Sequence, residues 1–219
     1  MRIIDPGLIG YEESVKLQEA LLHKRIKGDI GDTLIMLEHG PVVTLGRIDS
    51  GEGLVDRRFF SDRRIPVLST SRGGNITIHM PGQLVLYPVI DLSDKKKDVS
   101  FYIDFLEKTV SRALNRFGVP AERTPERRGV WVSGRKIAFT GIGVKRWVTY
   151  HGSSVNINND LEPFRHIYPC GEQDIQVTSA KEFLGQKLDM DEVKRVFREE
   201  FRTSMEREYG KGNMQLQWN

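Results

Sequence analysis

The single cysteine of this chain, Cys170, is the sequence feature that most restricts how it can fold. One thiol forms no internal disulfide and builds no cysteine-rich zinc site, so neither cross-link can hold the fold together. A hydrophobic core is left to do so, and 219 residues with 38% hydrophobic content are ample for one. We expect one domain over residues 1–219 and either a reducing compartment or indifference to redox state.

Hydrophobic spacing predicts three long helices, over residues 11–26, 101–117 and 191–209. Ser100 is expected to cap the second helix and Gly118 to end it, and a capping pattern at Ser179 opens a further short helix. The third long helix is expected to turn Val193, Val196, Phe197 and Phe201 inward.

Alternating or continuous apolar residues predict strands between these helices, over residues 34–37, 42–45, 66–68, 75–79, 84–92, 130–132, 136–144 and 147–157. A tight turn at Ser133-Gly134 makes a hairpin of two of them. The irregular succession of helices, strands and hairpins favours an α+β fold over a strictly alternating, doubly wound sheet.

Cys170 lies in a corner formed by Pro169, Cys170 and Gly171, where a lone thiol acts as a nucleophile if a neighbour stabilises its thiolate. An inert, buried cysteine is the ordinary alternative. Lys136, in an apolar strand, is a candidate base or hydrogen-bond donor; its alternative is a strand-edge lysine that faces water.

Two further segments carry polar groups beside glycines. In residues 71–83, Gly73-Gly74 allows close approach to a ligand, Arg72 offers a planar cation and His79 ends a strand; two consecutive turns with a surface histidine are the alternative. In residues 149–158, a structural role for His151 competes with a catalytic one.

The bulk properties exclude several classes of protein. A net charge of +3 is too weak to indicate nucleic-acid binding, but it is compatible with an acidic protein partner. The basic clusters are residues 95–97, 127–128 and 145–146. A mononuclear metal site of His79, His151 and Cys170 is disfavoured by their wide, irregular spacing. With no signal-peptide pattern and no apolar run of about 20 residues, we expect a cytoplasmic protein that does not enter the membrane.

Four motifs in order resemble the lipoyl(octanoyl) transferases of lipoate synthesis, over most of the chain from about Tyr11 to Gly171. The first is LEHGPVVTLGR at residues 37–47, and the second runs from Arg72-Gly73-Gly74 through His79 to residues 81–83 (PGQ). The third is GRKIA at residues 134–138, followed by WVTYHG at residues 147–152. The fourth runs from Phe164 through Ile167 to Pro169-Cys170-Gly171.

This resemblance implies a mixed β-sheet flanked by helices, like the catalytic domain of biotin and lipoate protein ligases. It implies that Cys170 and Lys136 are catalytic. It further implies that the substrate is bound by Arg72, Gly73, Gly74, His79, Gly82, Gln83, Ala138, Gly141, His151 and Gly152. Met80 replaces a glycine usual in the family, and we expect it either to narrow the acyl pocket or to brace the loop from beneath.

The implied reaction has two steps and needs no cofactor or metal. Cys170 takes an octanoyl group from octanoyl-acyl carrier protein, and a lysine amine of a lipoyl domain then receives it. The implied acceptors are the glycine cleavage H protein and the E2 subunits of 2-oxoacid dehydrogenases. The alternatives are an ATP-dependent lipoate or biotin protein ligase on the same fold, and a non-catalytic carrier-protein binding module.

Overall fold

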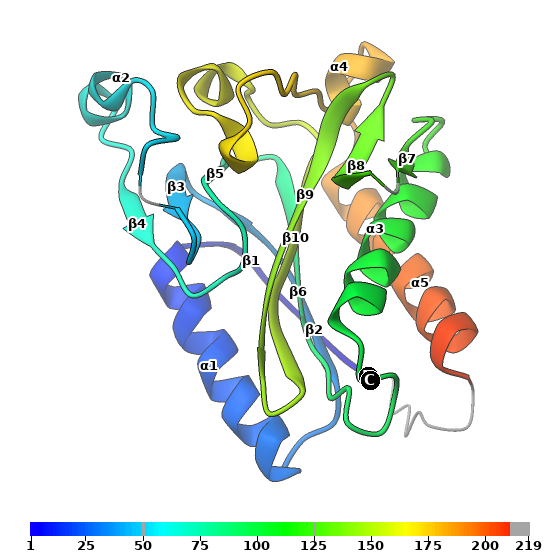
Figure 1. The fold of residues 1–219 in the computed structure, drawn as a ribbon. Coiled ribbons are helices and arrows are strands. Elements are labelled where there is room, and N and C mark those ends of the chain that lie inside the picture. The colour runs from blue at the N-terminus through cyan, green and yellow to red at the C-terminus, as the bar shows by residue number, and fades with distance from the viewer. Residues whose placement is uncertain (50, 125, 211–219) are drawn as a thin grey trace.

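A large and a small β-sheet form the framework of the computed structural model (Figure 1), which describes residues 1–49, 51–124 and 126–210. The large sheet contains, in spatial order, β1 (Arg2–Ile9), β2 (Thr33–His39), β6 (Gln83–Val89), β10 (Val148–Asn156), β9 (Arg135–Lys145), β8 (Arg127–Val132) and β7 (Glu122–Thr124). The small sheet contains β4 (Val67–Ser69), β3 (Val42–Leu45) and β5 (Thr77–His79). The predicted single domain over residues 1–219 includes residues outside those described.

Both sheets are mixed. In the large sheet β1 runs parallel to β2, and every other neighbouring pair is antiparallel. In the small sheet β3 is parallel to β4 and antiparallel to β5. The prediction of an α+β fold with a mixed sheet flanked by helices is therefore confirmed.

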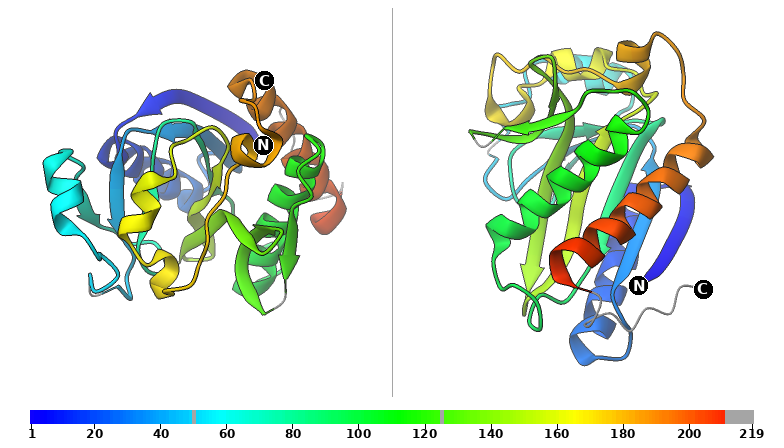
Figure 2. Two further views of the ribbon diagram at one scale, coloured as in Figure 1. Left: turned by 90° about the horizontal axis from the view of Figure 1, so that it is seen from above. Right: turned by 90° about the vertical axis from the view of Figure 1, so that its right-hand side faces the viewer.

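Helices cover both faces of the large sheet. Helix α1 (Tyr11–Lys27) lies on one face, and α3 (Val99–Asn115) packs with α5 (Met190–Tyr209) on the other (Figure 2). The remaining helical turns are α2 (Arg57–Asp62), η1 (Glu162–His166), η2 (Pro169–Gly171) and α4 (Ala180–Leu184). Among the described helices, none combines the length and apolar composition needed to cross a membrane.

The two covered faces explain why the central strands are apolar without interruption. Leu34 and Met36 of β2 pack into the core under α3 and α5, whereas Ile35 and Leu37 pack into the core under α1. Successive side chains of a strand point to opposite faces, so a strand buried on both sides needs an apolar residue at every position.

The sequence missed the strands β1 and β7, the helix α2 and the short turns η1 and η2, and it misplaced one N-terminal cap. Strand β1 escaped prediction because Pro6 interrupts it, and its register shifts between Ile4 and Gly7. The short elements β7 and α2 gave no periodic signal. The prediction that Ser100 caps the second long helix was wrong: α3 begins two residues earlier, and Asp98 accepts a hydrogen bond from the Phe101 amide (2.9 Å). The cap predicted at Ser179 is confirmed.

A second core cluster fills the space beside the small sheet. It joins Ile78 of β5 to Phe139 of β9 and Phe164 of η1, whose rings stack with centroids 5.4 Å apart. Met80 packs against this cluster. This contact favours bracing of the loop, and not narrowing of the acyl pocket, as the role of Met80.

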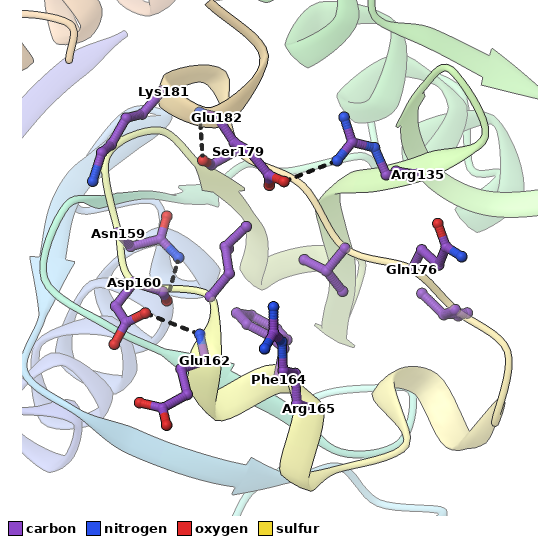
Figure 3. A pocket seen from close by; sticks show the side chains of 13 residues that line it. Arg135, Asn159, Asp160, Glu162, Phe164, Arg165, Gln176, Ser179, Lys181 and Glu182 are labelled. Atoms are coloured by element: carbon purple, nitrogen blue, oxygen red, sulfur yellow. Dashed lines mark hydrogen bonds and ion pairs between the residues drawn. The ribbon is translucent and has the colours of Figure 1, made fainter. Parts of the chain in front are cut away.

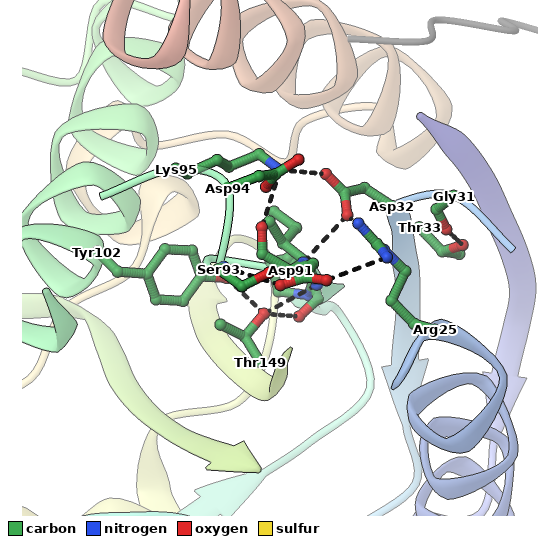
Figure 4. Close-up of polar contacts among 12 residues, drawn as sticks. Arg25, Gly31, Asp32, Thr33, Asp91, Ser93, Asp94, Lys95, Tyr102 and Thr149 are labelled. Atoms are coloured by element: carbon green, nitrogen blue, oxygen red, sulfur yellow. Dashed lines mark hydrogen bonds and ion pairs between the residues drawn. The ribbon is translucent and has the colours of Figure 1, made fainter. Parts of the chain in front are cut away.

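A polar network ties the end of α1 to the sheet (Figure 4). Asp32 accepts from Arg25 Nε (2.9 Å) and pairs with Lys95 Nζ (3.1 Å), and Arg25 also pairs with Asp91 (3.2 Å). The Lys95 side chain is only 2% exposed and also donates to the Asp91 carbonyl. Lys95 therefore anchors a loop, and its assignment to a basic surface cluster was wrong.

We predict that Lys95→Ala lowers the free energy of unfolding by about 1–3 kcal/mol, because the Asp32 carboxylate and the Asp91 carbonyl lose a buried donor. Lys97→Ala, an exposed lysine of the same loop, is the control and should change it by less than about 0.5 kcal/mol. Urea unfolding of both variants tests this. Equal effects of the two substitutions would remove the structural role of Lys95.

Candidate active site

Cys170 occupies a strained backbone corner in η2. Its φ of 60° and ψ of 13° lie in the left-handed region, which costs a residue with a side chain about 1–2 kcal/mol. Two contacts hold the corner: the Cys170 amide donates to the Ile76 carbonyl (3.2 Å), and Asn75 Nδ2 donates to the Cys170 carbonyl (2.6 Å). The loop that carries Gly73 and Gly74 thus fixes the cysteine.

Lys136 reaches this cysteine from β9. Its Nζ donates to Cys170 Sγ at 3.1 Å, and the lysine is 2% exposed. Its main chain bonds to Gln176 and Thr178 on one side, which fixes the root of the side chain. No ion pair in the described part of the chain supplies Lys136 with a carboxylate.

Aromatic rings take the place of a carboxylate around the ammonium. Lys136 Nζ lies 5.2 Å from the ring centroid of Trp131, its cross-strand partner on β8, and 5.1 Å from that of Phe139. The face of an aromatic ring attracts a cation within about 6 Å. The only anion-forming group in hydrogen-bond contact with this ammonium is therefore the Cys170 thiol, within the described residues.

A cavity of about 480 Å³ opens onto the pair at the junction of the two sheets. Its size falls in the range of small-molecule sites. It is lined by eight of the twelve residues that the sequence predicted for the site, namely Cys170, Lys136, Arg72, Gly73, Gly74, His79, Gly141 and Gly152. Met80 does not line it.

The loop of Arg72, Gly73 and Gly74 forms one wall of this cavity. The Arg72 guanidinium is buried and donates to both the carbonyl (2.7 Å) and the hydroxyl (2.9 Å) of Thr44 on β3. A Cβ on Gly46 would lie 1.9 Å from the Gly74 carbonyl oxygen, so glycine is required for the loop to pack this closely. Arg72 thus positions the wall as well as lining it.

Two of the four remaining predicted residues, Gln83 and Gly82, do not line the cavity but hold neighbouring segments in place. Gln83 Oε1 contacts His79 Nδ1 at 2.8 Å, while its amide nitrogen donates to the Ile78 carbonyl and to Asn156. This fixes Gln83 Oε1 as an acceptor, so His79 carries its proton on Nδ1. The Gly82 amide donates to Glu38 Oε2 (2.7 Å) and shapes the turn after β5.

The other two, Ala138 and His151, do not line the cavity either. A register shift between Val130 and Trp131 interrupts the strand alternation of the β8–β9 pair, and Ala138 packs into the core under α3. His151 is buried; its Nε2 contacts Ser71 Oγ (3.1 Å), and its backbone amide already donates to Gln18 Oε1 (2.7 Å). Gly82, Gln83, Ala138 and His151 therefore do not line the cavity, and their predicted part in substrate binding stays a prediction.

A larger cavity, of about 620 Å³, contains neither Cys170 nor Lys136 (Figure 3). Phe164 and Val177 line it together with several charged side chains, among them Arg135, which pairs with Glu182 at 2.9 Å. The stacked rings of Phe164 and Phe139 stand between the two cavities. The contact between Cys170 and Lys136 therefore belongs to the smaller cavity.

No group of three or more histidine, cysteine, aspartate or glutamate side chains is placed to hold a metal ion within residues 1–49, 51–124 and 126–210. His79 and Cys170 both line the smaller cavity, but His151 does not join them there.

Comparison with known proteins decides the family. The model of the lipoyl protein ligase A/B catalytic domain matches residues 10–202. The chain belongs to this family. It is 42% identical over 202 residues to an octanoyltransferase of Maridesulfovibrio salexigens, covering 92% of this chain and 94% of the relative. It is 44% identical over 204 residues to an octanoyltransferase of Nitratidesulfovibrio vulgaris, covering 92% and 93%. The resemblance read from the four motifs is confirmed.

Solved structures show the same fold at low identity. The bipartite lipoate protein ligase of Thermoplasma acidophilum superposes with a TM-score of 0.70 at 16% identity, over 93% of this chain and 83% of that one. The biotin protein ligase of Aquifex aeolicus gives a TM-score of 0.60 at 14% identity, over 96% and 72%. The fold predicted for this lipoyl protein ligase-like domain is thereby confirmed.

Several residues of the site were not named as site residues from the sequence. Asn75 holds the cysteine corner, Trp131 and Phe139 face the ammonium, and Arg47 and Ile48 line the cavity. The predicted hairpin places Trp131 in the strand beside that of Lys136. Of these contacts, this cross-strand one could therefore be predicted from the sequence.

The buried histidines of this domain are neutral near pH 7. Burial lowers the pKa of His39 to about 4, and also that of His151 to about 4, where the charges of Arg72 and Arg47 act in the same direction. Burial lowers the pKa of His79 well below its ordinary value, assisted by His39. The His39 Nδ1 proton points to the Ile9 carbonyl, so its Nε2 accepts from Tyr87.

These lowered pKa values predict that the folded protein loses stability as the pH falls. The unfolded chain binds protons at His39 and His151 below about pH 6.5, whereas the folded chain does so only below about 4, so stability falls as the pH drops through this window. Each histidine should cost about 2 kcal/mol between pH 7 and pH 5. Urea unfolding at both pH values measures the loss, and a free energy of unfolding unchanged between them would contradict the assignment.

Proposed function

We propose that this chain is an octanoyltransferase in which Cys170 carries the acyl group and Lys136 transfers the proton. The observation that carries the proposal is the 3.1 Å contact of Lys136 Nζ with Cys170 Sγ, in a cavity that both residues line. The naming of close relatives as octanoyltransferases supports the acyl group and the reaction class.

The first step forms a thioester on the enzyme. Lys136 takes the Cys170 proton and the thiolate attacks the carbonyl carbon of the donor thioester. The C–S bond of the donor then breaks, and the donor leaves as a thiolate that takes the proton from Lys136 and becomes a thiol. The incoming and outgoing bonds are both thioesters, so the acyl group stays activated without ATP. The Gly73 and Gly171 amides already donate to Ile142 and Tyr168, so they do not supply the oxyanion donors expected from the glycine-rich loops.

The second step forms an amide. A neutral lysine ε-amine of the acceptor attacks the Cys170 thioester, loses a proton to a base, and expels the thiolate. Lys136, neutral again after giving its proton to the leaving thiolate of the first step, is the group in position to take this proton and pass it to the expelled Cys170 thiolate. The donor is proposed to be octanoyl-acyl carrier protein and the acceptor a lipoyl domain; a cytoplasmic location remains a prediction.

An ATP-dependent ligase on the same fold is the second candidate, since the solved structures of this fold include lipoate and biotin ligases. Adenylation of a free acid uses no nucleophilic cysteine. The contact between Cys170 and Lys136 therefore favours transfer, as a ligase would give this thiol no task.

Incubation with octanoyl-acyl carrier protein, without ATP, should raise the intact mass by one octanoyl group. Cys170→Ala should remove both the adduct and turnover, because the chain has no other cysteine. Lys136→Met keeps the stem but not the amine and should lower kcat by about 10²–10⁴-fold. Lys136→Arg should fail as well, since a guanidinium does not release its proton. Turnover by Cys170→Ala at the parent rate would exclude the covalent mechanism.

The mouth of the cavity suggests how an acidic carrier protein approaches. Arg47 is exposed at this mouth beside Ile48, which is 75% exposed, and Arg128 and Val99 stand there too. Of the basic clusters noted in the sequence, only the one containing Arg128 lines the cavity.

We predict that the second-order rate constant with carrier-bound donor falls as ionic strength rises, and that Arg47→Gln lowers it at low salt. Charge steering acts on association and is screened within about 10 Å at 0.1 M salt. The rate with octanoyl-pantetheine should change much less. Lys145→Gln, exposed but away from the cavity, is the control. Equal salt dependence for both donors would remove any steering role of the mouth.

A further inference from the structure

Behind the ammonium of Lys136 lies a glycine that the proposed mechanism does not use. A Cβ on Gly129 would lie 2.5 Å from Lys136 Cε and 2.6 Å from the Ala138 carbonyl oxygen. The glycine also has a φ of 99°, a conformation that side chains rarely adopt. The Gly129 backbone therefore forms the surface against which the stem of Lys136 packs.

Strand pairing does not hold this backbone in place. The β8–β9 register begins at Val130, opposite Ala138, and shifts immediately after it. Gly129 lies just before that irregularity, and its amide donates to a side chain instead: Glu107 Oε1 on α3, at 2.7 Å. A carboxylate from the neighbouring helix thus replaces a ladder partner.

Glu107 is an unusual residue for its place. It is 0% exposed, on a helix face whose other buried members include Phe105, Leu106 and Val110. Burial raises its pKa, against the lowering effects of the hydrogen bond from Gly129 and of the charges of Arg128 and Arg123. A buried carboxylate is costly unless it is paired and hydrogen-bonded. Arg123 Nε donates to its second oxygen at 3.1 Å, so both oxygens are occupied.

We propose that Glu107 is a positioning residue for Lys136: by fixing the Gly129 backbone, it holds the lysine stem so that Nζ meets Cys170 Sγ. The proposal rests on the function proposed for the Lys136–Cys170 pair. A displacement of about 1 Å at a catalytic group can cost about 10²-fold in rate. The competing explanation is that Glu107 only anchors β7 to α3 through Arg123.

The test follows Cys170 directly. Only one cysteine is present, so iodoacetamide at pH 7 labels Cys170 alone, and intact mass gives the rate. The thiolate is the reacting form, so this rate reports how well Lys136 stabilises it. Turnover of octanoyl-pantetheine is measured in parallel, because a small donor avoids effects on carrier docking.

Glu107→Leu should lower kcat by about 10–100-fold and slow alkylation, and Glu107→Gln, which keeps one acceptor for the Gly129 amide, should restore part of both. Asp104→Asn is the matched control: it lies on the same helix and contacts the same Arg123, but not Gly129. It should leave kcat and alkylation within about twofold of the parent.

The decisive measurement is the double variant. If Glu107 acts through the lysine, Glu107→Leu combined with Lys136→Met should alkylate no more slowly than Lys136→Met alone. Additive effects, or a folded Glu107→Leu that keeps parent alkylation and kcat, would overturn the proposal; if Glu107→Leu does not fold, Glu107→Gln takes its place in the same comparison. Failure of the proposed function is distinct: Lys136→Met itself would then alkylate like the parent, and Glu107 would have no catalytic lysine to position.

Discussion

The lysine nitrogen of Lys136 lies 3.1 Å from the sulfur of Cys170, with two aromatic rings nearby and, among the described residues, no carboxylate at ion-pair distance. The rest of the site depends on this contact. A buried ammonium without a counter-ion is costly, and here the thiol is the group that can become one. Because the contact is a single hydrogen bond between two side chains, both side chains need to be held in place. The surrounding structure supplies two rigid supports, one for each partner.

The two supports come from distant parts of the chain. The cysteine corner is held by the loop between β4 and β5, through Asn75 and Ile76. The lysine is held by pairing of β9 with the segment around Gln176 and by the backbone of Gly129. The left-handed conformation of Cys170 stores strain that these contacts offset, which is typical of backbone corners at functional sites.

Much of this was readable from the sequence, and the failures have physical causes. Helices and central strands were predicted because each is buried along a regular stripe or on both faces. Strand β1 was missed because Pro6 and Gly7 break its pattern, although pairing with β2 overrides that local preference. The motifs named twelve site residues, and eight of them line one cavity. Whether such a residue lines the cavity depends on which face of its strand the side chain leaves. The register shift between Val130 and Trp131 changes this for Ala138, which packs into the core. Contacts such as Glu107 to Gly129, which join a helix to a strand irregularity, have no sequence periodicity at all.

The fold itself leaves the chemistry open. Ligases that consume ATP share this arrangement of sheets at 14–16% identity, so the sheets alone do not distinguish adenylation from thioester transfer. What distinguishes them here is a lone thiol directed at a buried lysine inside the acyl-sized cavity. In the mechanism proposed above, a thioester on Cys170 would keep the acyl group as reactive as it arrives, so the donor would already supply the activation that a ligase obtains from ATP.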